Sequence, residues 1–402
     1  MDYTSERQNQ GINEYGMVYE IDSLYDYFSR VTDPRSKLGK QYALNTILVW
    51  MTLAKLGGQD KPSGMAEWIA HRKELWVEYR ITNKSKTPSH MTYRRVLQQI
   101  LCAEEFEDLL KGYHQQWMEK GQEVVFSVDG KTVRGTIAGG ERRGTHLLAI
   151  YVPQRGLVLA QARVDAKENE ITTAPQLLKQ VSLDGAIVIA DAMHTQKAMA
   201  RQVVEAGGDY LLTVKGNQSH TRWAIEKLFV QEVCNLQKGG SLSKGFEMAV
   251  KTEKGHGRIE KRTLMTSTLL NKYLEEWPYL AQVFRIEHIT WYDHMSRYTR
   301  QITYGITSLQ PQKANPEKLL QLHRTYWGIE SGLHYRRDVT LQEDRTRLTV
   351  GDAGQNMAIL NNLVLGLCLS SGLKNLARAR RLFDAFPAMA LSLLTSVPIP
   401  SL

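Results

Sequence analysis

The pattern of apolar and polar residues divides the chain into a helical part and a later part in which strands and helices alternate. Residues 18–120 carry apolar positions at helical spacing, which predicts an all-helical N-terminal domain. Residues 1–17 precede this pattern and are expected to be poorly ordered. From residue 123 short β-type runs replace the helical pattern, so a second domain is expected to begin there.

The second part predicts a definite order of elements. Strands are expected at 123–129, 146–153 and 157–164, followed by a helix at 172–181, a strand at 186–191, a helix at 195–206, a strand at 209–214 and a helix at 220–233. This is the order of a ribonuclease-H-like core, an α/β fold with a mixed five-stranded sheet and flanking helices. In that topology the first and fourth strands are neighbours, although many residues separate them in the chain.

The remaining segments complete the predicted organisation. Residues 121–233 form the first part of the core, residues 234–312 a β-rich insertion, and residues 313–370 the final helices of the core. A basic helical C-terminal tail is expected over 371–402. The apolar stretches 43–56 and 357–369 contain polar breaks and predict buried core helices.

Three carboxylates are the candidate catalytic and metal-binding residues. Asp129 and Asp191 each follow a β-type run, and Glu330 lies in a predicted helix at about 315–336. Carboxylate oxygens suit Mg²⁺ or Mn²⁺, and two such ions can activate a hydroxyl and stabilise a leaving oxygen at phosphorus. The alternative, purely structural interpretations are a surface turn at Asp129, a helix N-cap at Asp191 and a salt-bridge network around Glu330.

The helix that carries Glu330 is rich in aromatic and basic residues. Positions 323, 327, 330, 334 and 337 fall near one face of a regular α-helix, so their side chains are expected to line a groove together. Glu343 and Asp344 are rival acids that could hold metal or neighbouring arginines, and the second role is favoured.

Charge and motif positions add candidate DNA contacts. With 51 Lys and Arg against 42 Asp and Glu, the formal charge of +9 favours a polyanionic partner. Residues 84–97 resemble the second helix of a helix-turn-helix, with a solvated basic face as the equal alternative. The residues predicted to contact DNA are Lys131, Arg134, Lys215, Asn217, Gln218, His256, Arg258, Arg262, Arg324, His334, Arg337, Arg94 and Arg95.

Composition also argues against several classes of protein. The three cysteines are far apart, so neither a disulfide framework nor a structural zinc site is expected. No segment has the uninterrupted apolar length of a membrane span, and the N-terminus has no leader pattern. We therefore expect a cytoplasmic protein.

Seven motifs, taken in order, resemble the ISAs-type branch of bacterial DDE transposases, which includes the H-repeat-associated proteins. They are DGKTVRGT, KENEITTAPQLL, DAMHTQ, DYLLTVKGNQ, GHGRIEKR, YWGIESGLHYRRDVTLQEDRTR and NMAILNN, and the likeness spans about residues 20–370. The resemblance implies that Asp129, Asp191 and Glu330 are the catalytic acids. The chain departs from the family's third motif at Ser331, Tyr335 and the Arg336–Arg337 pair.

The resemblance implies a transposase that binds the terminal inverted repeats of its own element. It would use two Mg²⁺ ions, with Mn²⁺ as a substitute, to hydrolyse a phosphodiester and to join the resulting 3′-hydroxyl to target DNA. Synapsis of two ends implies a dimer or higher oligomer on double-stranded DNA. Two alternatives stay open: a catalytically silent DNA-binding protein derived from such an element, and a ribonuclease-H-like nuclease without strand transfer.

Overall fold

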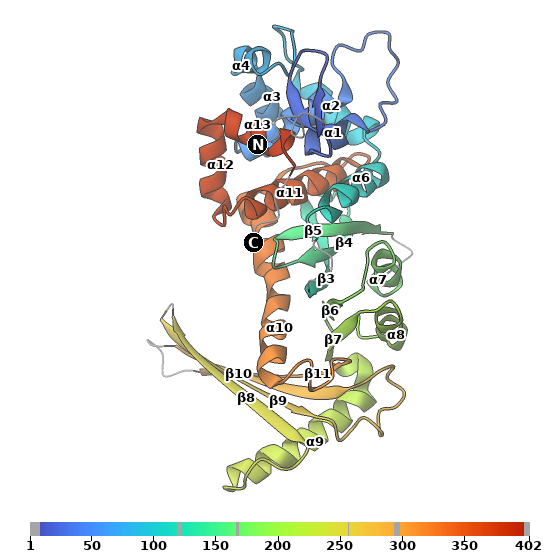
Figure 1. Cartoon of the computed structure of the whole chain (residues 1–402), viewed down its shortest axis with the longest axis vertical. Coiled ribbons are helices and arrows are strands. Elements are labelled where there is room, and N and C mark those ends of the chain that lie inside the picture. Colours follow the sequence, from blue (N-terminus) through green and yellow to red (C-terminus); the bar gives the residue numbers. More distant parts are fainter. Residues whose placement is uncertain (1–8, 119–122, 166–168, 256, 293–297, 398–402) are drawn as a thin grey trace, which may run out of the picture. The chain divides into compact units, whose positions relative to one another are not determined.

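A computed structural model describes residues 9–118, 123–165, 169–255, 257–292 and 298–397 (Figure 1). The chain forms two compact units. The first unit contains the described residues within 1–120, 130–164 and 330–402, and the second unit those within 121–129 and 165–329. Strand β3 (Val124–Val133) therefore begins in the second unit and ends in the first.

The second unit is built on a mixed sheet. Its strands follow the order β3-β6-β7-β11-β10-β9-β8, in which β3, β6 and β7 are parallel and the others join antiparallel. The strands after β3 are β6 (Ala186–Ala190), β7 (Asp209–Val214), β8 (Phe246–Gly255), β9 (Arg258–Ser267), β10 (Gln282–Tyr292) and β11 (Tyr298–Thr307). The predicted strands at 123–129, 186–191 and 209–214 are confirmed, and so is the pairing of the first with the fourth.

The predicted insertion at 234–312 extends this sheet. Strand β11 pairs with β7, so β8 to β11 continue the sheet that the parallel strands begin. Strands β8 to β11 all lie within this segment. The order of elements assigned no partner to the strands of the insertion, so the continuity with β7 was not predicted.

Helices cover the sheet of the second unit. They are α7 (Glu170–Leu178), α8 (Lys197–Glu205), α9 (Ser219–Gln237) and α10 (Pro316–Gly328). The start of helix α10 has two typical N-terminal features. The Asn315 side chain accepts a hydrogen bond from the Lys318 N–H as the N-cap, and Pro316 occupies the first helical position. Its leucines at 319, 320 and 322 pack in one buried cluster with Val125 and with residues of β6 and β7.

The first unit is mainly helical. It contains α1 (Leu24–Ser29), α2 (Leu44–Leu56), α3 (Pro62–Ala70), α4 (Lys73–Glu78), α5 (His90–Arg95), α6 (Ala103–Gln115), α11 (Ala353–Ser370), α12 (Leu376–Ala385) and α13 (Pro387–Thr395), together with the end of β3 and the hairpin of β4 (Thr145–Val152) and β5 (Leu157–Val164). Helices α2 and α11 are buried almost all round, as predicted for the two apolar stretches.

The expectation for the N-terminal end of the chain was wrong, while the C-terminal segment contains the helices α12 and α13. Residues Gln10–Ile12 form strand β1, which pairs with β2 (Val18–Glu20). Met17, in the segment that connects the two strands, is buried. The N-terminal part is therefore not all-helical, and its described residues 9–17 are folded. At the other end Arg380, inside the predicted basic tail, is buried and donates hydrogen bonds to the Lys55 carbonyl and to Asp60.

The predicted helix-turn-helix segment is a short helix with an irregular continuation. Helix α5 has six residues and passes into a π-helical turn at Val96–Ile100. The Asn356 side chain of α11 donates hydrogen bonds to the Leu97 and Leu101 carbonyls, so this segment packs on α11. Arg94 and Arg95 nevertheless stay exposed. No helix in the described part of the chain is long and apolar enough to cross a bilayer.

Candidate active site

Asp129 and Asp191 lie where the parallel pairing of β3 with β6 ends. Asp129 is inside β3, which continues to Val133 instead of ending at the acid as predicted, and Asp191 directly follows β6. Val128 of β3 is the register partner of Ala190 of β6, and each aspartate is the next residue of its strand path. Polar groups at this edge of an open α/β sheet form the usual ligand site of such folds. Asp129 and Asp191 are 62 positions apart in the sequence, yet they are neighbours in the sheet, as predicted.

The alternation of side chains places both aspartates on one face of the sheet. Val125 of β3 and Ile187 and Ile189 of β6 point into the cluster that α10 covers. Side chains of a strand alternate between its two faces. Asp129, four residues after Val125, and Asp191, two residues after Ile189, therefore point in the same direction. They belong to the face that α10 covers, and α10 is the helix that leads into Glu330.

The turn after Asp191 is held by its own carboxylate. Asp191 Oδ1 accepts hydrogen bonds from the backbone N–H groups of Met193 at 2.8 Å and His194 at 3.4 Å. The N-cap of α8 is Gln196, so Asp191 caps a turn and not the helix that the alternative interpretation assigned to it. Among the described residues, nothing is hydrogen-bonded to its other oxygen, Oδ2.

Asn217 and Gln218 support this turn. The Asn217 amide donates to the Ala192 carbonyl, and the Gln218 amide donates to the Thr195 carbonyl at 2.9 Å. The Thr195 hydroxyl in turn donates to the Thr213 carbonyl at 2.6 Å. The sequence predicted DNA contacts for Asn217 and Gln218, whereas the structure uses both amides to fix the backbone beside Asp191.

The KENEITT motif contributes a further support. His194 is buried, and its Nε2 lies 3.1 Å from Glu170 at the start of α7. Helix α7 itself is anchored by a capping box between Asn169 and Thr172. Sequence reasoning gave neither residue a role. Because His194 and Glu170 are 24 positions apart, the sequence carried no direct indication that they pair. The only indication was that the two motifs that contain them occur in the same chain.

Removing the Gln218 amide is expected to impair catalysis more than folding. In Gln218→Ala the Thr195 carbonyl loses its donor and the Asp191 turn loses a fixed partner, so we expect the rate of strand cleavage to fall about 10-fold to 100-fold. The unfolding free energy should fall by about 1 kcal/mol. Single-turnover cleavage and urea unfolding measure the two quantities. Equal cleavage rates for the variant and the wild type would show that the turn does not depend on this bond.

Glu330 lies in an irregular helix, which overturns the predicted groove face. Helix α10 ends at Gly328, and Ile329–His334 and Arg336–Thr340 are π-helical. The wider turn shifts each later side chain relative to a regular α-helix, so the five positions from 323 to 337 do not form one stripe. Glu330 and Trp327 are exposed, while Arg337 is fully buried.

Arg337 is the centre of a buried polar network in the first unit. Its Nε donates a hydrogen bond to Glu343 at 3.0 Å, its Nη2 lies 2.9 Å from the same carboxylate as an ion pair, and Asn361 donates to that carboxylate at 2.8 Å. Burial opposes ionisation of Glu343, but the Arg337 charge and these hydrogen bonds hold its pKa below the ordinary value. Arg337 is therefore removed from the predicted DNA contacts, and the favoured role of Glu343 as an arginine partner is confirmed.

The network reaches Glu107 of α6 through Gln161. Gln161 donates to the Glu107 carboxylate at 2.7 Å and accepts from Asn362 at 2.9 Å. Burial raises the pKa of Glu107 to about 8, despite the hydrogen bond from Gln161 and the charge of Arg337. Two of the asparagines in the NMAILNN motif thus serve this buried network.

The raised pKa of Glu107 predicts that the stability of the fold decreases between about pH 4.5 and pH 8. The folded protein holds this proton more tightly than the unfolded chain, so the contribution is complete below about pH 4.5 and is lost as the pH rises through about 8. In Glu107→Gln the neutral group is permanent, and we expect a smaller fall in unfolding free energy between these values. Urea unfolding as a function of pH tests this; parallel curves for both proteins would contradict it.

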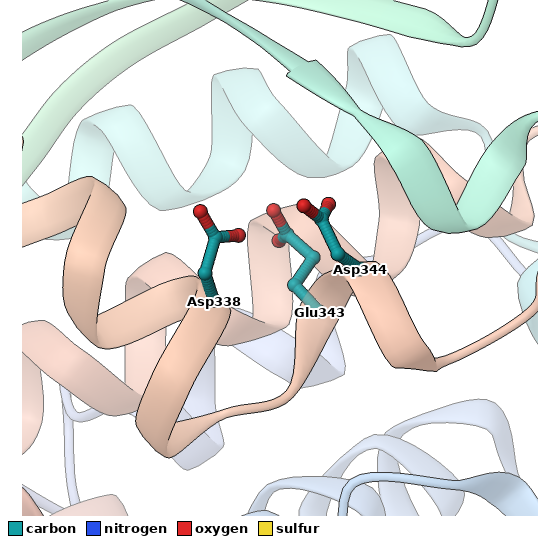
Figure 2. Close-up of side chains that lie close together, drawn as sticks. All are labelled: Asp338, Glu343 and Asp344. Atoms are coloured by element: carbon teal, nitrogen blue, oxygen red, sulfur yellow. The ribbon is translucent and has the colours of Figure 1, made fainter.

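Lys131 is also engaged within the protein. Figure 2 shows Asp338, Glu343 and Asp344 side by side, with ligand oxygens within 4.8 Å of one another. The Lys131 ammonium lies 2.7 Å from Asp338 and 3.8 Å from Asp344, which also accepts from the Arg134 N–H. Arg337 pairs with Glu343, so the cluster of Asp338, Glu343 and Asp344 already binds two cationic side chains. It anchors the end of β3, and Lys131 is not free for the predicted phosphate contact.

The other predicted basic contacts differ in their surroundings. Lys215 and Arg134 are exposed, and His334 is half-buried in the π-helical segment. Arg258, Arg262 and Arg324 are ion-paired with Glu260 or Glu253 around a pocket of about 420 Å³. His256 lies outside the described residues.

The same pocket is lined by two histidines, His288 and His323. Burial lowers the pKa of His323 to about 4 and, with the nearby Arg262, also lowers that of His288. Gln301 and exposed Trp327 complete a lining with hydrogen-bonding groups and a flat apolar surface.

Two acids that directly follow the last paired residues of β3 and β6, and a helix that leads to a third acid, supply residue types that metal-dependent phosphoryl transfer uses. Residues 120–367 match the family described as "Transposase DDE domain", and residues 25–114 match the family described as "DDE_Tnp_1-associated". The chain belongs to the DDE transposase family. The resemblance inferred from the seven motifs is thereby confirmed.

Two relatives named as putative transposases are similar to this chain over most of its length. "Putative transposase YncI" of Escherichia coli O157:H7 is 29% identical over 86% of this chain and 87% of its own. "H repeat-associated putative transposase YhhI" of Escherichia coli K12 is 25% identical over 87% of this chain and 90% of its own. A cryo-EM structure of a piggyBac transposase synaptic complex with hairpin DNA is similar with a TM-score of 0.41 and 10% identity, over 93% of this chain and 77% of that one.

Proposed function

We propose that this protein is a DNA transposase with a ribonuclease-H-like catalytic core, which binds the terminal inverted repeats of its element, cleaves a phosphodiester and joins the 3′-hydroxyl to target DNA. Membership of the DDE family supports the class of reaction. The observation that carries the proposal is the placement of Asp129 and Asp191 directly after the last paired residues of β3 and β6, on the sheet face covered by the helix that leads to Glu330.

The residues present suit a divalent metal. Asp191 has a turn-fixing oxygen and a second oxygen that no described residue engages, and Asp129 is its strand neighbour. Oxygen ligands of this kind are those of Mg²⁺ and Mn²⁺, and bound metal would lower the pKa of an attacking hydroxyl and stabilise the departing oxygen. We assign Asp129, Asp191 and Glu330 to hold it.

The chain's own groups would position the DNA around these acids. The turn at 191–196, fixed by Asn217, Gln218 and the His194–Glu170 pair, keeps Asp191 in a single orientation. Lys215 is exposed directly after β7, where its charge can meet a backbone phosphate. A dimer or higher oligomer would be needed to hold two element ends at once.

Cleavage of the element's own ends tests the proposal. The full chain is incubated with labelled duplexes that carry the DNA flanking its gene, in Mg²⁺, in Mn²⁺ or in a chelator, and products are mapped on both strands. We expect metal-dependent nicks at the element boundary that leave a 3′-hydroxyl, followed by joined products with target DNA. Specific binding without nicks would support a silent DNA-binding protein, and nicking without joining would support a nuclease.

A further inference from the structure

A basic pocket lies in the first unit and is made by residues of three separate segments. It has a volume of about 410 Å³ and is lined by Lys61 and the first turn of α3, by His90 and Arg94 of α5, and by residues 345–348 with Arg345 and Arg347. Only Arg94 among these residues was predicted to contact DNA. The other lining residues are Pro62, Ser63, Thr346 and Leu348.

The cations of this pocket have no acidic partner within the described ranges. Lys61, Arg94, Arg345 and Arg347 are exposed, and none makes an ion pair there. Lys131, Arg337 and Arg380 of the same unit, in contrast, all pair with carboxylates. Like charges that line one concavity repel each other, so their arrangement favours the binding of an anion.

The local fold fixes this arrangement. Along residues 345–348 the two arginines are exposed while Thr346 and Leu348 are buried, and Leu348 donates a backbone hydrogen bond to the Gly135 carbonyl. A Cβ atom on Gly135 would lie 2.5 Å from the Thr346 carbonyl oxygen, so the close approach of the two backbones requires glycine there. Buried Tyr93 next to Arg94 anchors the α5 side.

The start of α3 adds a second source of positive potential. This helix begins at Pro62 and runs for nine residues, with Ser63 in its first turn facing the pocket. Backbone N–H groups at a helix N-terminus carry partial positive charge and bind phosphate oxygens. Guanidinium groups and a serine hydroxyl complete a donor set that fits a tetrahedral phosphate.

We propose that this basic pocket binds one backbone phosphate of duplex DNA. The proposal rests on the proposed function, because it assumes that DNA is the partner. The lining recognises phosphate but not bases: apart from His90 it contains no aromatic ring, and its apolar members are Pro62 and Leu348. The pocket would therefore fix the position of the duplex on the first unit without reading its sequence.

Salt-dependent DNA binding by the full chain, without divalent metal, tests the proposal. We compare the wild type with Arg345→Gln/Arg347→Gln in anisotropy titrations of a labelled duplex between about 50 and 200 mM salt. One lost phosphate should reduce the slope of log K against log salt by about 0.9, which is about an eightfold loss of affinity near 0.1 M salt. Adding Arg94→Gln should change the slope little more, because the three arginines would share one phosphate.

The control variant is Arg201→Gln/Arg222→Gln. It removes the same charge from exposed arginines of α8 and α9 in the second unit, where each faces only a glutamate one helical turn away. An equal loss of affinity in this control, or a slope that falls by about 0.9 with each pocket arginine, would overturn the single-phosphate site.

Chemical protection separates DNA from free phosphate as the ligand. Phenylglyoxal modification of the full chain, mapped by peptide mass spectrometry, should be slowed at Arg94, Arg345 and Arg347 by duplex DNA. Protection by inorganic phosphate alone, with none by DNA, would overturn the assignment to DNA. If the wild type binds no DNA at all, the proposed function fails, and protection by inorganic phosphate would still show whether the pocket takes an anion.

Discussion

Asp191→Asn is expected to reduce metal-dependent strand cleavage by about 10²-fold to 10³-fold or more, the range for removing one group that stabilises charge in a transition state. Asparagine retains an Oδ1 that can accept from the Met193 and His194 N–H groups, so the turn should persist. Only the negative charge and the second carboxylate oxygen are lost. DNA binding without metal should be no weaker than that of the wild type.

The matched control is Asp184→Asn. Asp184 is exposed and lies before the amino end of β6, whereas Asp191 lies just after its carboxyl end. Both variants lose one charge from the same strand region, so only the position differs. Cleavage at the wild-type rate by Asp191→Asn, or an equal loss in Asp184→Asn, would refute the catalytic assignment.

The elements around Asp191 could be predicted from sequence because their patterns are local. The run AIVIA, which becomes β6, is apolar throughout, as a strand buried on both faces must be, and the acid that follows marks its end. The parallel pairing of β3 with β6 then followed from the order of elements. These features need only the spacing of side chains along one stretch of chain.

The rest of the site depends on partners that are distant in sequence. Lys131 and Asp338 are separated by 207 positions, and nothing near either residue shows that they pair. Asn217 and Gln218 have the composition of a phosphate-binding loop, yet their amides bond the turn at 191–196. Donors of this kind serve a backbone carbonyl or a phosphate equally well, and only the fold decides between them.

The π-helical stretch around Glu330 could not be foreseen from helical periodicity. Gly332 in this stretch lies so close to Tyr151 that a Cβ atom would be 2.7 Å from its hydroxyl oxygen. Further along, burial of Arg337 fixes the register of the next turn. Tertiary contacts thus override the regular spacing on which the predicted groove face depended.

Arg337→Met is expected to destabilise the protein by about 3–5 kcal/mol, because it leaves the Glu343 carboxylate buried with no cation. Urea unfolding, followed by tryptophan fluorescence, measures the change. Arg336→Met is the neighbouring control: its guanidinium makes one long hydrogen bond, 3.3 Å to the Lys374 carbonyl, and its loss should cost about 0.5 kcal/mol or less.

The double variant Arg337→Met/Glu343→Gln distinguishes an uncompensated charge from lost packing. Glutamine keeps an acceptor for the Asn361 amide but carries no charge, so most of the lost stability should return. If the double variant is as unstable as Arg337→Met, shape and not charge is the contribution of Arg337. If stability returns while cleavage stays slow, the ion pair has a second role. It would then hold the π-helical stretch that follows Glu330 in the geometry that catalysis requires.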